Sequence, residues 1–556
     1  MKGAARLPLF GGCDGWEESY IHICMKKNKI IKGAAILAAA GAACKVIGAL
    51  YRIPLANLLG AEGMADYQAA YPIYALLLVI ATGGLPPAIS KLVAGNAGQG
   101  AERILRTSLL FFMSVGAVFS AALFLLRGPL AEALGLSSSA PAIGAIAPSI
   151  LFATGVSALR GYFQGRCDMI PTAVSQVIEQ VMKLIVGLLL AWRLYPLGES
   201  IAAAGAMLGV TAGEIVAFLA LLFRYMRKRP EILPQKTGQS GCLRAILLVA
   251  LPVTLSACVV PIEGVIDSAM VVNLMTASGA SIAYARTAFG IFTGFVCPVA
   301  AVPAVMTMAL NQSLLPAIAE AKTAGDMASM EKRAHTGLSL SIIIGLPMTA
   351  LLFVLGGDIL GAIFPSLTSE ELAFATGLMK VDCLTVGFIS VIHITSALLH
   401  ATGHTVIPLV SLGAGCIVKV AVGAMTIPVL GVVGAAIGSA ACFAAAIVPC
   451  LVLACKYTHV RLSFARDVLP PLASTALAVL VMAALAGGRG IVSVALACLA
   501  SAAAYFLCLA TFTALTRGGQ RIYNNSYAGR KNAAGACLIT ERASHVRLHK
   551  TNASRK

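Results

Sequence analysis

Charged residues are scarce in this chain of 556 residues, and acids are scarcer than bases. Only 12% of the residues are Asp, Glu, Lys or Arg, against about 25% in a typical soluble domain. Hydrophobic residues make up 59% of the chain and the mean hydropathy is +0.88. A soluble core of this length does not need so much apolar sequence, so the composition excludes an ordinary soluble protein and indicates a membrane protein.

Signatures of nucleotide and metal chemistry are also missing. The chain has no Walker A sequence, no GxGxxG after a strand and no GxSxG elbow, so we expect no ATP hydrolysis. Its 15 cysteines form no CxxC pair and many lie in apolar runs, which favours small core residues over a disulfide or zinc framework. His393, His400 and His404 cluster without an acid or cysteine to complete a ligand set. We therefore predict no metal site and no cofactor.

The net charge of +18 is concentrated at the two ends of the chain. Residues 1–32 hold six bases and three acids, residues 517–556 hold nine and one, and the remainder carries +7. This distribution is typical of basic cytoplasmic segments and argues against nucleic acid as a partner.

A short basic tail from Met25 precedes the first apolar run. We expect the biological start at Met25 and no cleavable signal peptide.

Apolar runs long enough to cross a bilayer, about 17–25 residues each, recur along the chain and predict an all-α polytopic membrane protein with about fourteen transmembrane helices. Bases gather in the connections after even-numbered spans, for example Arg224, Arg227, Lys228 and Arg229. The positive-inside rule therefore places both termini in the cytoplasm, and the family resemblance given below implies a bacterial cytoplasmic membrane. The predicted spans are 34–57, 69–93, 105–126, 140–163, 172–194, 201–223, 243–266, 281–308, 334–355, 378–399, 405–427, 433–454, 467–486 and 491–515.

The chain repeats itself at an offset of 229 residues: Pro87-Ala-Ile matches Pro316-Ala-Ile, and the pair Gly205/Gly209 matches Gly434/Gly438. This repeat predicts two pseudo-symmetric six-helix bundles around a central cavity, related by an axis along the membrane normal. The predicted organisation is an N-terminal cytoplasmic tail 1–32, of which 1–24 is expected to be a mis-assigned start, a bundle 33–223, a basic cytoplasmic linker 224–242, a bundle 243–455, two additional helices 456–516, and a basic cytoplasmic tail 517–556.

Ionisable side chains inside the predicted spans are few, and each costs about 2.5–3.5 kcal/mol at the bilayer centre. Lys45 and Arg52 lie two helical turns apart on one face, and Lys183 and Lys419 occupy matching positions in the two halves. These bases suit an anionic substrate such as a phosphate or pyrophosphate. The predicted substrate-binding residues are Arg52, Lys45, Lys183, Arg286, Lys419, Gln176 and Gln180.

Three acids are predicted to gate or couple transport: Glu179, Glu263 and Asp267. Glu263 and Asp267 would partner the bases when no substrate is present, and Glu179 lies in a polar stripe with Gln176, Gln180 and Lys183. Two plainer interpretations stay open. Glu179 and Lys183 are spaced as an i, i+4 pair and would form a self-neutralised structural contact. Arg52 or Arg286 would instead extend to a membrane interface.

Several segments resemble the polysaccharide biosynthesis and stage V sporulation protein B family, over roughly residues 25–515. They are Tyr51-Arg-Ile-Pro-Leu-Ala-Asn-Leu-Leu-Gly-Ala-Glu-Gly-Met64, Tyr67-Gln-Ala-Ala-Tyr-Pro-Ile-Tyr74, Gly83-Gly-Leu-Pro-Pro-Ala-Ile-Ser-Lys91, Gly161-Tyr-Phe-Gln-Gly165, Met169-Ile-Pro-Thr-Ala-Val-Ser-Gln176 and Ser313-Leu-Leu-Pro-Ala-Ile-Ala-Glu320. The resemblance extends to the multidrug, oligosaccharidyl-lipid and polysaccharide exporter (MOP) superfamily, with its multidrug (MATE) branch and MurJ-type lipid II flippases. It implies alternating access, and Arg52 and Arg286 as the cavity arginines that hold a pyrophosphate.

The function implied is a flippase for an undecaprenyl-type lipid-linked saccharide, a peptidoglycan or polysaccharide precursor of the cell wall or the spore. Its expected partners are the lipid-linked anionic sugar, membrane lipids, and cell-wall or polysaccharide synthesis enzymes. A cation-coupled multidrug exporter of the same superfamily is the alternative, since such a protein would centre on acids. A membrane glycosyltransferase is a more distant alternative, because the connecting loops are short and poor in acids and histidines.

Overall fold

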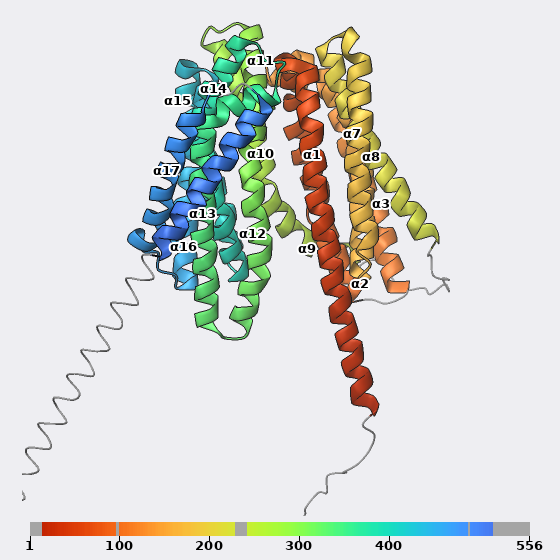
Figure 1. Ribbon diagram of the computed structural model, residues 1–556. Coiled ribbons are helices and arrows are strands. Elements are labelled where there is room, and N and C mark those ends of the chain that lie inside the picture. The colour runs from red at the N-terminus through yellow and green to blue at the C-terminus, as the bar shows by residue number, and fades with distance from the viewer. Residues whose placement is uncertain (1–13, 96–98, 228–241, 488–489, 515–556) are drawn as a thin grey trace, which may run out of the picture. The chain divides into compact units, whose positions relative to one another are not determined.

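In the computed structural model, the described residues are 14–95, 99–227, 242–487 and 490–514, and they form helices joined by short turns, with no strand among them (Figure 1). Twelve helical segments in this part of the chain are long and apolar enough to cross a membrane. The predicted all-α membrane fold is therefore confirmed. The predicted tail 517–556 and most of the linker 224–242 lie outside the described residues.

The predicted number of fourteen spans is not reproduced. Spans 34–57 and 69–93 both fall within one apolar helical stretch, Ala35–Ala94. Span 243–266 falls on two shorter helices that break at Cys258. A sequence pattern marks apolar runs, but it does not show where a helix continues through a connection or stops inside a run.

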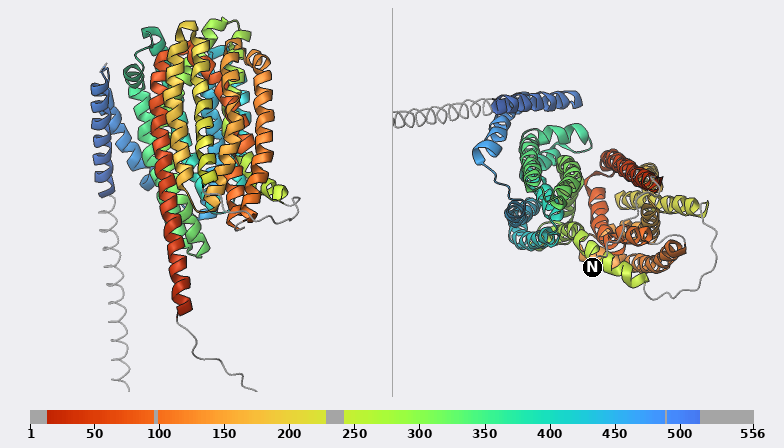
Figure 2. Two further views of the ribbon diagram at one scale, coloured as in Figure 1. Left: turned by 90° about the vertical axis from the view of Figure 1, so that its right-hand side faces the viewer. Right: turned by 90° about the horizontal axis from the view of Figure 1, so that it is seen from below.

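The N-terminal helices are α1 (Asp14–Thr82), α2 (Leu85–Ala94), α3 (Gln99–Leu125), α4 (Arg127–Ala133), α5 (Ala140–Ile146), α6 (Ser149–Gly165), α7 (Ile170–Leu194) and α8 (Glu199–Arg227). Helix α1 is kinked at Gly60, where φ is 65° and ψ is −172°. Glycine adopts this left-handed φ without a steric penalty, so the chain bends there and remains helical on both sides. Helices α1, α7 and α8 run side by side (Figures 1 and 2).

The later helices are α9 (Cys242–Ala257), α10 (Val259–Ala277), α11 (Ile282–Gly290), α12 (Cys297–Thr323), α13 (Met327–Ile363), α14 (Ser369–Ala401), α15 (Val406–Leu430), α16 (Val432–Thr458) and α17 (Leu469–Leu485). Two π-helical turns, η3 (Ile291–Val296) and η4 (Phe464–Val468), precede α12 and α17. A further helical stretch spans Ile491–Ala514.

Contacts divide the chain into two units. Unit 1 comprises Met1–Val302, Leu360–Thr385 and His404–Cys450, and unit 2 comprises Pro303–Ile359, Val386–Gly403 and Leu451–Lys556. The division does not follow the predicted halves, because α12, α13, α14 and α16 each contribute residues to both units. The two bundles and their central cavity therefore stay predictions. Every predicted site residue lies in unit 1.

Unit 2 has an apolar core of its own. Leu355, Ala478, Met482, Ala497 and Tyr505 are buried together. The Tyr505 hydroxyl donates to the Ile343 carbonyl oxygen at 2.8 Å, which satisfies the one polar group of that side chain. This core joins α13, α17 and the stretch Ile491–Ala514.

A stripe of glycines on α8 brings this helix into backbone contact with α7. A Cβ atom added to Gly209 would lie 2.2 Å from the Gly187 Cα, and one added to Gly213 would lie 2.7 Å from the Glu179 carbonyl oxygen. Gly205 is similarly close to Leu190, at 2.9 Å from its carbonyl carbon. Small residues four apart on a membrane helix allow such close packing, because lipid supplies no hydrophobic force between helices.

The same arrangement recurs between α15 and α16. A Cβ added to Gly434 would lie 2.5 Å from the Ile427 nitrogen. One added to Gly438 would lie 3.4 Å from the Lys419 carbonyl oxygen and 3.7 Å from the Gly423 Cα. Gly209 faces the Lys183 carbonyl oxygen in the same way, at 3.2 Å. Lys183 and Lys419 thus hold matching positions next to a glycine contact, as the repeat predicts.

We predict that Gly209→Ala destabilises the protein, because the added methyl group has no space against Gly187 and forces α7 and α8 apart. Overpacking of this kind costs about 1–3 kcal/mol. Gly41→Ala is the matched control, since a Cβ there meets no atom within 4 Å. The measurement is the midpoint of thermal unfolding of the purified protein in detergent. Equal midpoints for the two variants would contradict the predicted contact.

Candidate functional site

Arg52 on α1 donates to a backbone carbonyl rather than to an acid. Its Nη2 lies 3.1 Å from the carbonyl oxygen of Thr293, and the Nε2 of Gln68 donates to the same oxygen at 2.5 Å. Thr293 lies in the π-helical turn η3. A π-helical turn shifts the regular backbone ladder and makes a carbonyl available to side-chain donors, and such turns occur frequently at functional sites.

Lys183 on α7 lies over two aromatic rings of α1. Its Nζ is 5.0 Å from the centroid of the Tyr51 ring and 5.4 Å from that of Tyr71. Tyr71 in turn stacks on Tyr67, with centroids 6.1 Å apart. The electron-rich ring faces attract the ammonium group without neutralising it. Arg52 follows Tyr51, whose ring Lys183 contacts, and both Arg52 and Glu179 act electrostatically on Lys183. We call Arg52 and Lys183 the open cation cluster.

The open cation cluster has unused hydrogen-bonding capacity. Within the described part of the chain, the Nε of Arg52 and the Oε1 of Gln68, which shares the Thr293 oxygen with Arg52, are buried without a hydrogen-bond partner. The Oε1 of Gln176, on the same helix as Lys183, is in the same state. Buried polar atoms in this state are rare in folded proteins and each needs an explanation. Lys45, two turns before Arg52, is exposed. Within the described residues, neither Arg52 nor Lys183 has a carboxylate within 4 Å.

Glu179 does not pair with Lys183, so the interpretation of these two residues as a self-neutralised pair is wrong. Glu179 accepts instead from Arg160 on α6, with Nη2 and Oε2 3.0 Å apart. Gln180 donates to the other oxygen of Glu179 at 3.2 Å. Arg160 also donates from Nε to the Ser175 hydroxyl at 2.9 Å. Arg160 lies inside the predicted span 140–163, and the rule that every ionisable residue within a span needs a reason would have identified it.

Arg286 on α11 is held by two acids of α1. Its Nη1 lies 2.8 Å from Oε2 of Glu62 and its Nη2 lies 2.9 Å from Oδ2 of Asp66. Asp66 is fully buried and also accepts from the hydroxyls of Ser138 and Ser200, each at 2.6 Å. The sequence placed Asp66 and Glu62 in a polar connection between two spans. Because α1 continues through that connection, both carboxylates lie against α11.

Lys419 on α15 is enclosed by acids of α10. Its Nζ lies 2.7 Å from Oδ2 of Asp267 and 3.1 Å from Oε1 of Glu263, and 3% of its side chain is exposed. The predicted pairing of these two acids with a base is present. Asp382 on α14 is also buried and acts electrostatically with Lys419, Asp267 and Glu263. The sequence reading did not single out Asp382, although it lies inside the predicted span 378–399.

The described residues therefore surround the bases with more carboxylates than the sequence indicated. In the part of the chain that the structure describes, Arg160, Arg286 and Lys419 each have a carboxylate within 4 Å, whereas Arg52 donates to a carbonyl oxygen and Lys183 lies over aromatic rings. Among the residues that the structure describes, no group of His, Cys, Asp and Glu is arranged to hold a metal ion. In unit 2 the Nδ1 atom of His393 lies 3.0 Å from the Thr307 hydroxyl.

Comparisons with known proteins identify a family and proteins of similar sequence and fold. The profile of a family described as "Polysaccharide biosynthesis protein" matches residues 30–322. Three proteins of Bacillus subtilis (strain 168) are similar in sequence. An uncharacterized membrane protein, YabM, is 29% identical over 76% of this chain and 79% of its own length. Stage V sporulation protein B is 30% identical over 62% and 68%. The lipid II flippase MurJ is 23% identical over 74% and 80%.

Two solved structures share the fold. A lipid II flippase MurJ in an inward closed conformation aligns with a TM-score of 0.67 at 15% identity, over 86% of this chain and 98% of that one. An inward-facing multidrug resistance transporter of the MATE family of the MOP superfamily aligns with a TM-score of 0.64 at 16% identity, over 74% and 94%. Among these proteins, those whose names state an activity are a lipid II flippase and a multidrug resistance transporter rather than enzymes, as predicted. This chain shares the fold of both solved structures.

We predict that Lys419→Met destabilises the protein strongly, because Glu263 and Asp267 are then left as buried charges without a base. Breaking a buried ion pair in this way costs roughly 3–5 kcal/mol. The triple variant Lys419→Met/Glu263→Gln/Asp267→Asn removes the charges together and should recover most of that loss. Thermal unfolding in detergent compares the three proteins. A triple variant as unstable as Lys419→Met would contradict the ion-pair explanation.

Proposed function

Because this chain belongs to the polysaccharide biosynthesis protein family, we propose that it is a flippase for an undecaprenyl-type lipid-linked saccharide. The protein is a multi-pass membrane protein of the MOP superfamily. Its proposed cargo carries a pyrophosphate and a sugar and is a precursor of peptidoglycan or of another polysaccharide. The proposed movement is from the inner to the outer leaflet of the cytoplasmic membrane by alternating access, with both termini in the cytoplasm. The similarity to a lipid II flippase supports the lipid-linked cargo.

The open cation cluster is the observation that carries the proposal. Arg52 donates to a carbonyl oxygen and Lys183 lies over two aromatic rings. A pyrophosphate gives them shorter and roughly twice as strong charge-assisted hydrogen bonds. It need not displace a carboxylate first. Gln176 and Gln180, on α7 with Lys183, supply neutral donors and acceptors for the sugar. Lys45 on α1 is the exposed base that the head group meets before Arg52.

Arg286 and Lys419 are also proposed to bind the substrate, but later in the cycle than Arg52 and Lys183. Each can contact the anionic head group only after its bonds to Asp66 or to Asp267 are broken. We assign to these ion pairs, and to Glu179 and Glu263, the gating and coupling of the cycle. Binding at the open cation cluster would come first, and exchange of acid partners for substrate would accompany the change of access.

The membrane potential gives this cycle a direction without ATP. Two negative charges moved outward across an inside-negative potential of ~100 mV release about 4.6 kcal/mol. Any protein charge that moves the opposite way reduces this gain. A pyrophosphate is therefore cargo that the resting potential itself expels.

A cation-coupled multidrug exporter is the second candidate, and one observation favours it. Glu263, Asp267 and Asp382 outnumber Lys419 in their cluster, and acids attract cations. The fold is also that of a multidrug resistance transporter. Efflux of organic cations driven by a sodium or proton gradient in proteoliposomes would support the exporter, and its absence together with flipping of a lipid-linked sugar would support the flippase.

We predict that Arg52→Gln and Lys183→Gln each weaken binding of the lipid-linked pyrophosphate about 10–100-fold, the value of one hydrogen bond to a charged group. Arg52→Glu should abolish transport. The protein is expressed in a bacterial strain depleted of its lipid II flippase, and growth and flipping in proteoliposomes are measured. Arg193→Gln, an exposed base at the far end of α7, is the control. Undiminished rescue by Arg52→Glu would refute the role of the open cation cluster.

We also predict that an inside-negative potential accelerates outward movement of a lipid-linked pyrophosphate in proteoliposomes, because the cargo carries about two negative charges. The potential is set with a potassium gradient and valinomycin, and outward movement is followed with an impermeant reagent for the sugar. The same cargo with its charge removed by esterification serves as the control. A rate independent of the potential for both lipids would exclude charge-driven transport.

A further inference from the structure

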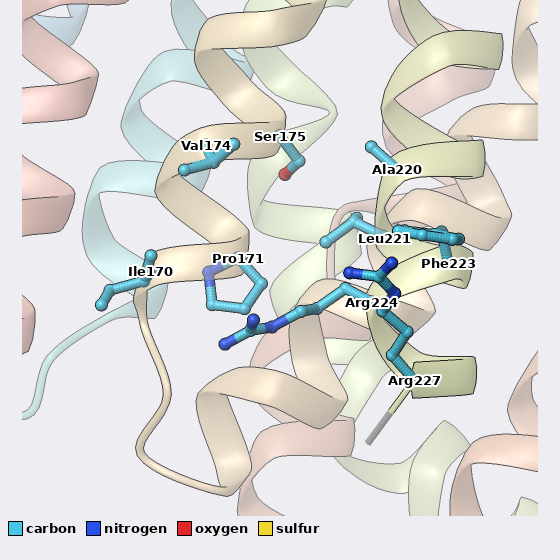
Figure 3. Close-up of a pocket in the computed structure, with 9 residues that line it drawn as sticks. All are labelled: Ile170, Pro171, Val174, Ser175, Ala220, Leu221, Phe223, Arg224 and Arg227. Atoms are coloured by element: carbon cyan, nitrogen blue, oxygen red, sulfur yellow. The ribbon is translucent and has the colours of Figure 1, made fainter. Parts of the chain in front are cut away.

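A groove lies between α7 and α8, at the first turns of α7 and the last turns of α8 (Figure 3). Its volume is about 290 Å³. Apolar side chains form its walls, and the side chains of Arg224 and Arg227 extend over one end (Figure 3). The complete lining is Ile170, Pro171, Val174, Ser175, Ala220, Leu221, Phe223, Arg224 and Arg227.

The groove opens onto a face of unit 1 that is apolar over much of both helices. On α7 the large exposed side chains are Ile170, Val174, Ile185, Leu189 and Trp192, and on α8 they are Leu208, Leu219, Phe223 and Met226. Large hydrophobic side chains exposed in such numbers along a membrane helix face acyl chains rather than water. The groove is therefore accessible from the lipid phase.

The two arginines are available to an anion. Arg227 lies over the Phe223 ring, with 4.5 Å from its Cζ to the ring centroid, and within the described residues no carboxylate lies within 4 Å of it. Arg224 has one acidic neighbour, Asp168, at 3.8 Å, and both side chains are partly exposed. An exposed pair at that distance contributes little. Both guanidinium groups can therefore donate to a phosphate.

This groove is separate from the open cation cluster. Val174 and Lys183 are both on α7, and nine residues correspond to about two and a half helical turns, so the two side chains leave α7 on opposite faces. Arg224 and Arg227 also fall in the connection that the positive-inside rule places in the cytoplasm, at the level of the lipid head groups.

We propose that this groove binds an anionic glycerophospholipid of the inner leaflet. Its phosphate lies between Arg224 and Arg227, and one acyl chain runs along Ile170, Val174 and Phe223. The match of two bases to an anionic head group, at the end of an apolar groove that opens to lipid, is the chemistry that recognises this ligand. A zwitterionic lipid offers the same acyl chains but brings a positive group toward the arginines.

The test is native mass spectrometry of the full chain, purified in a neutral detergent and titrated with phosphatidylglycerol or with phosphatidylcholine. The probe variant is Arg224→Gln/Arg227→Gln. The control variant is Arg127→Gln/Arg193→Gln, which also removes two exposed arginines that lie over aromatic rings. We expect the probe variant to bind phosphatidylglycerol about 30-fold more weakly, which corresponds to two basic contacts of about 1 kcal/mol each. The control variant should bind it like the unchanged protein.

A second variant tests the groove without changing its charge. Val174→Trp fills the apolar wall and should weaken binding of phosphatidylglycerol while both arginines remain. Equal binding of phosphatidylglycerol by the probe and control variants, or equal binding of the two lipids by the unchanged protein, would overturn the proposal. A competition result would also overturn the proposal. If an undecaprenyl pyrophosphate displaced phosphatidylglycerol from the control variant but not from the probe variant, the groove would be an entry site for cargo.

Discussion

The energetic cost of a charge inside a membrane is the constraint on which the arrangement of unit 1 depends. An unpaired ionisable group at the bilayer centre costs about 2.5–3.5 kcal/mol, so each base needs a partner from another part of the chain. Lys419 forms ion pairs with two acids of α10, and Arg286 forms ion pairs with two acids of α1. Arg160 finds Glu179 one helix later. These pairs connect helices that lipid alone would not hold together, because acyl chains are as apolar as the side chains between helices.

Backbone contacts at glycine decide where two of the bases lie. Gly209 packs on Gly187 and Gly438 packs near Gly423, and in each case a lysine precedes the inner glycine by four residues. The lysine is thus one turn from a glycine contact between two helices. From there, Lys183 extends over tyrosine rings of α1 and Lys419 extends to acids of α10. The two lysines therefore share a backbone arrangement but differ in their chemical environment. The side chains of the neighbouring helix, tyrosines of α1 or acids of α10, set that environment.

The sequence predicts the membrane class, most of the spans and the matched lysines, because apolar runs and glycine repeats are local patterns. It predicts that Glu263 and Asp267 pair with a base, but it does not identify Lys419 as that base, and it does not predict the ion pairs of Arg286. Arg286 and Asp66 are 220 residues apart, and Lys419 and Asp267 are 152 apart. Nothing within a single span indicates such partners. Asp66 illustrates the physical reason. It falls in the connection between the predicted spans 34–57 and 69–93, but α1 remains helical beyond Gly60 and places this carboxylate, fully buried, next to Arg286.

The bases of unit 1 fall into two kinds, and the difference bears on how binding and conformational change are coupled. An anion that meets Arg52 and Lys183 replaces a neutral carbonyl and ring faces, so binding there leaves the ion pairs of Arg160, Arg286 and Lys419 intact. An anion that meets Arg286 or Lys419 must leave a buried acid without its base, which costs several kcal/mol unless the acid moves or takes up a cation. A ligand at the first kind of base therefore binds without rearrangement. A ligand at Arg286 or Lys419 binds more tightly to a conformation in which the released acids have new partners. Its binding therefore shifts the conformational equilibrium toward that conformation.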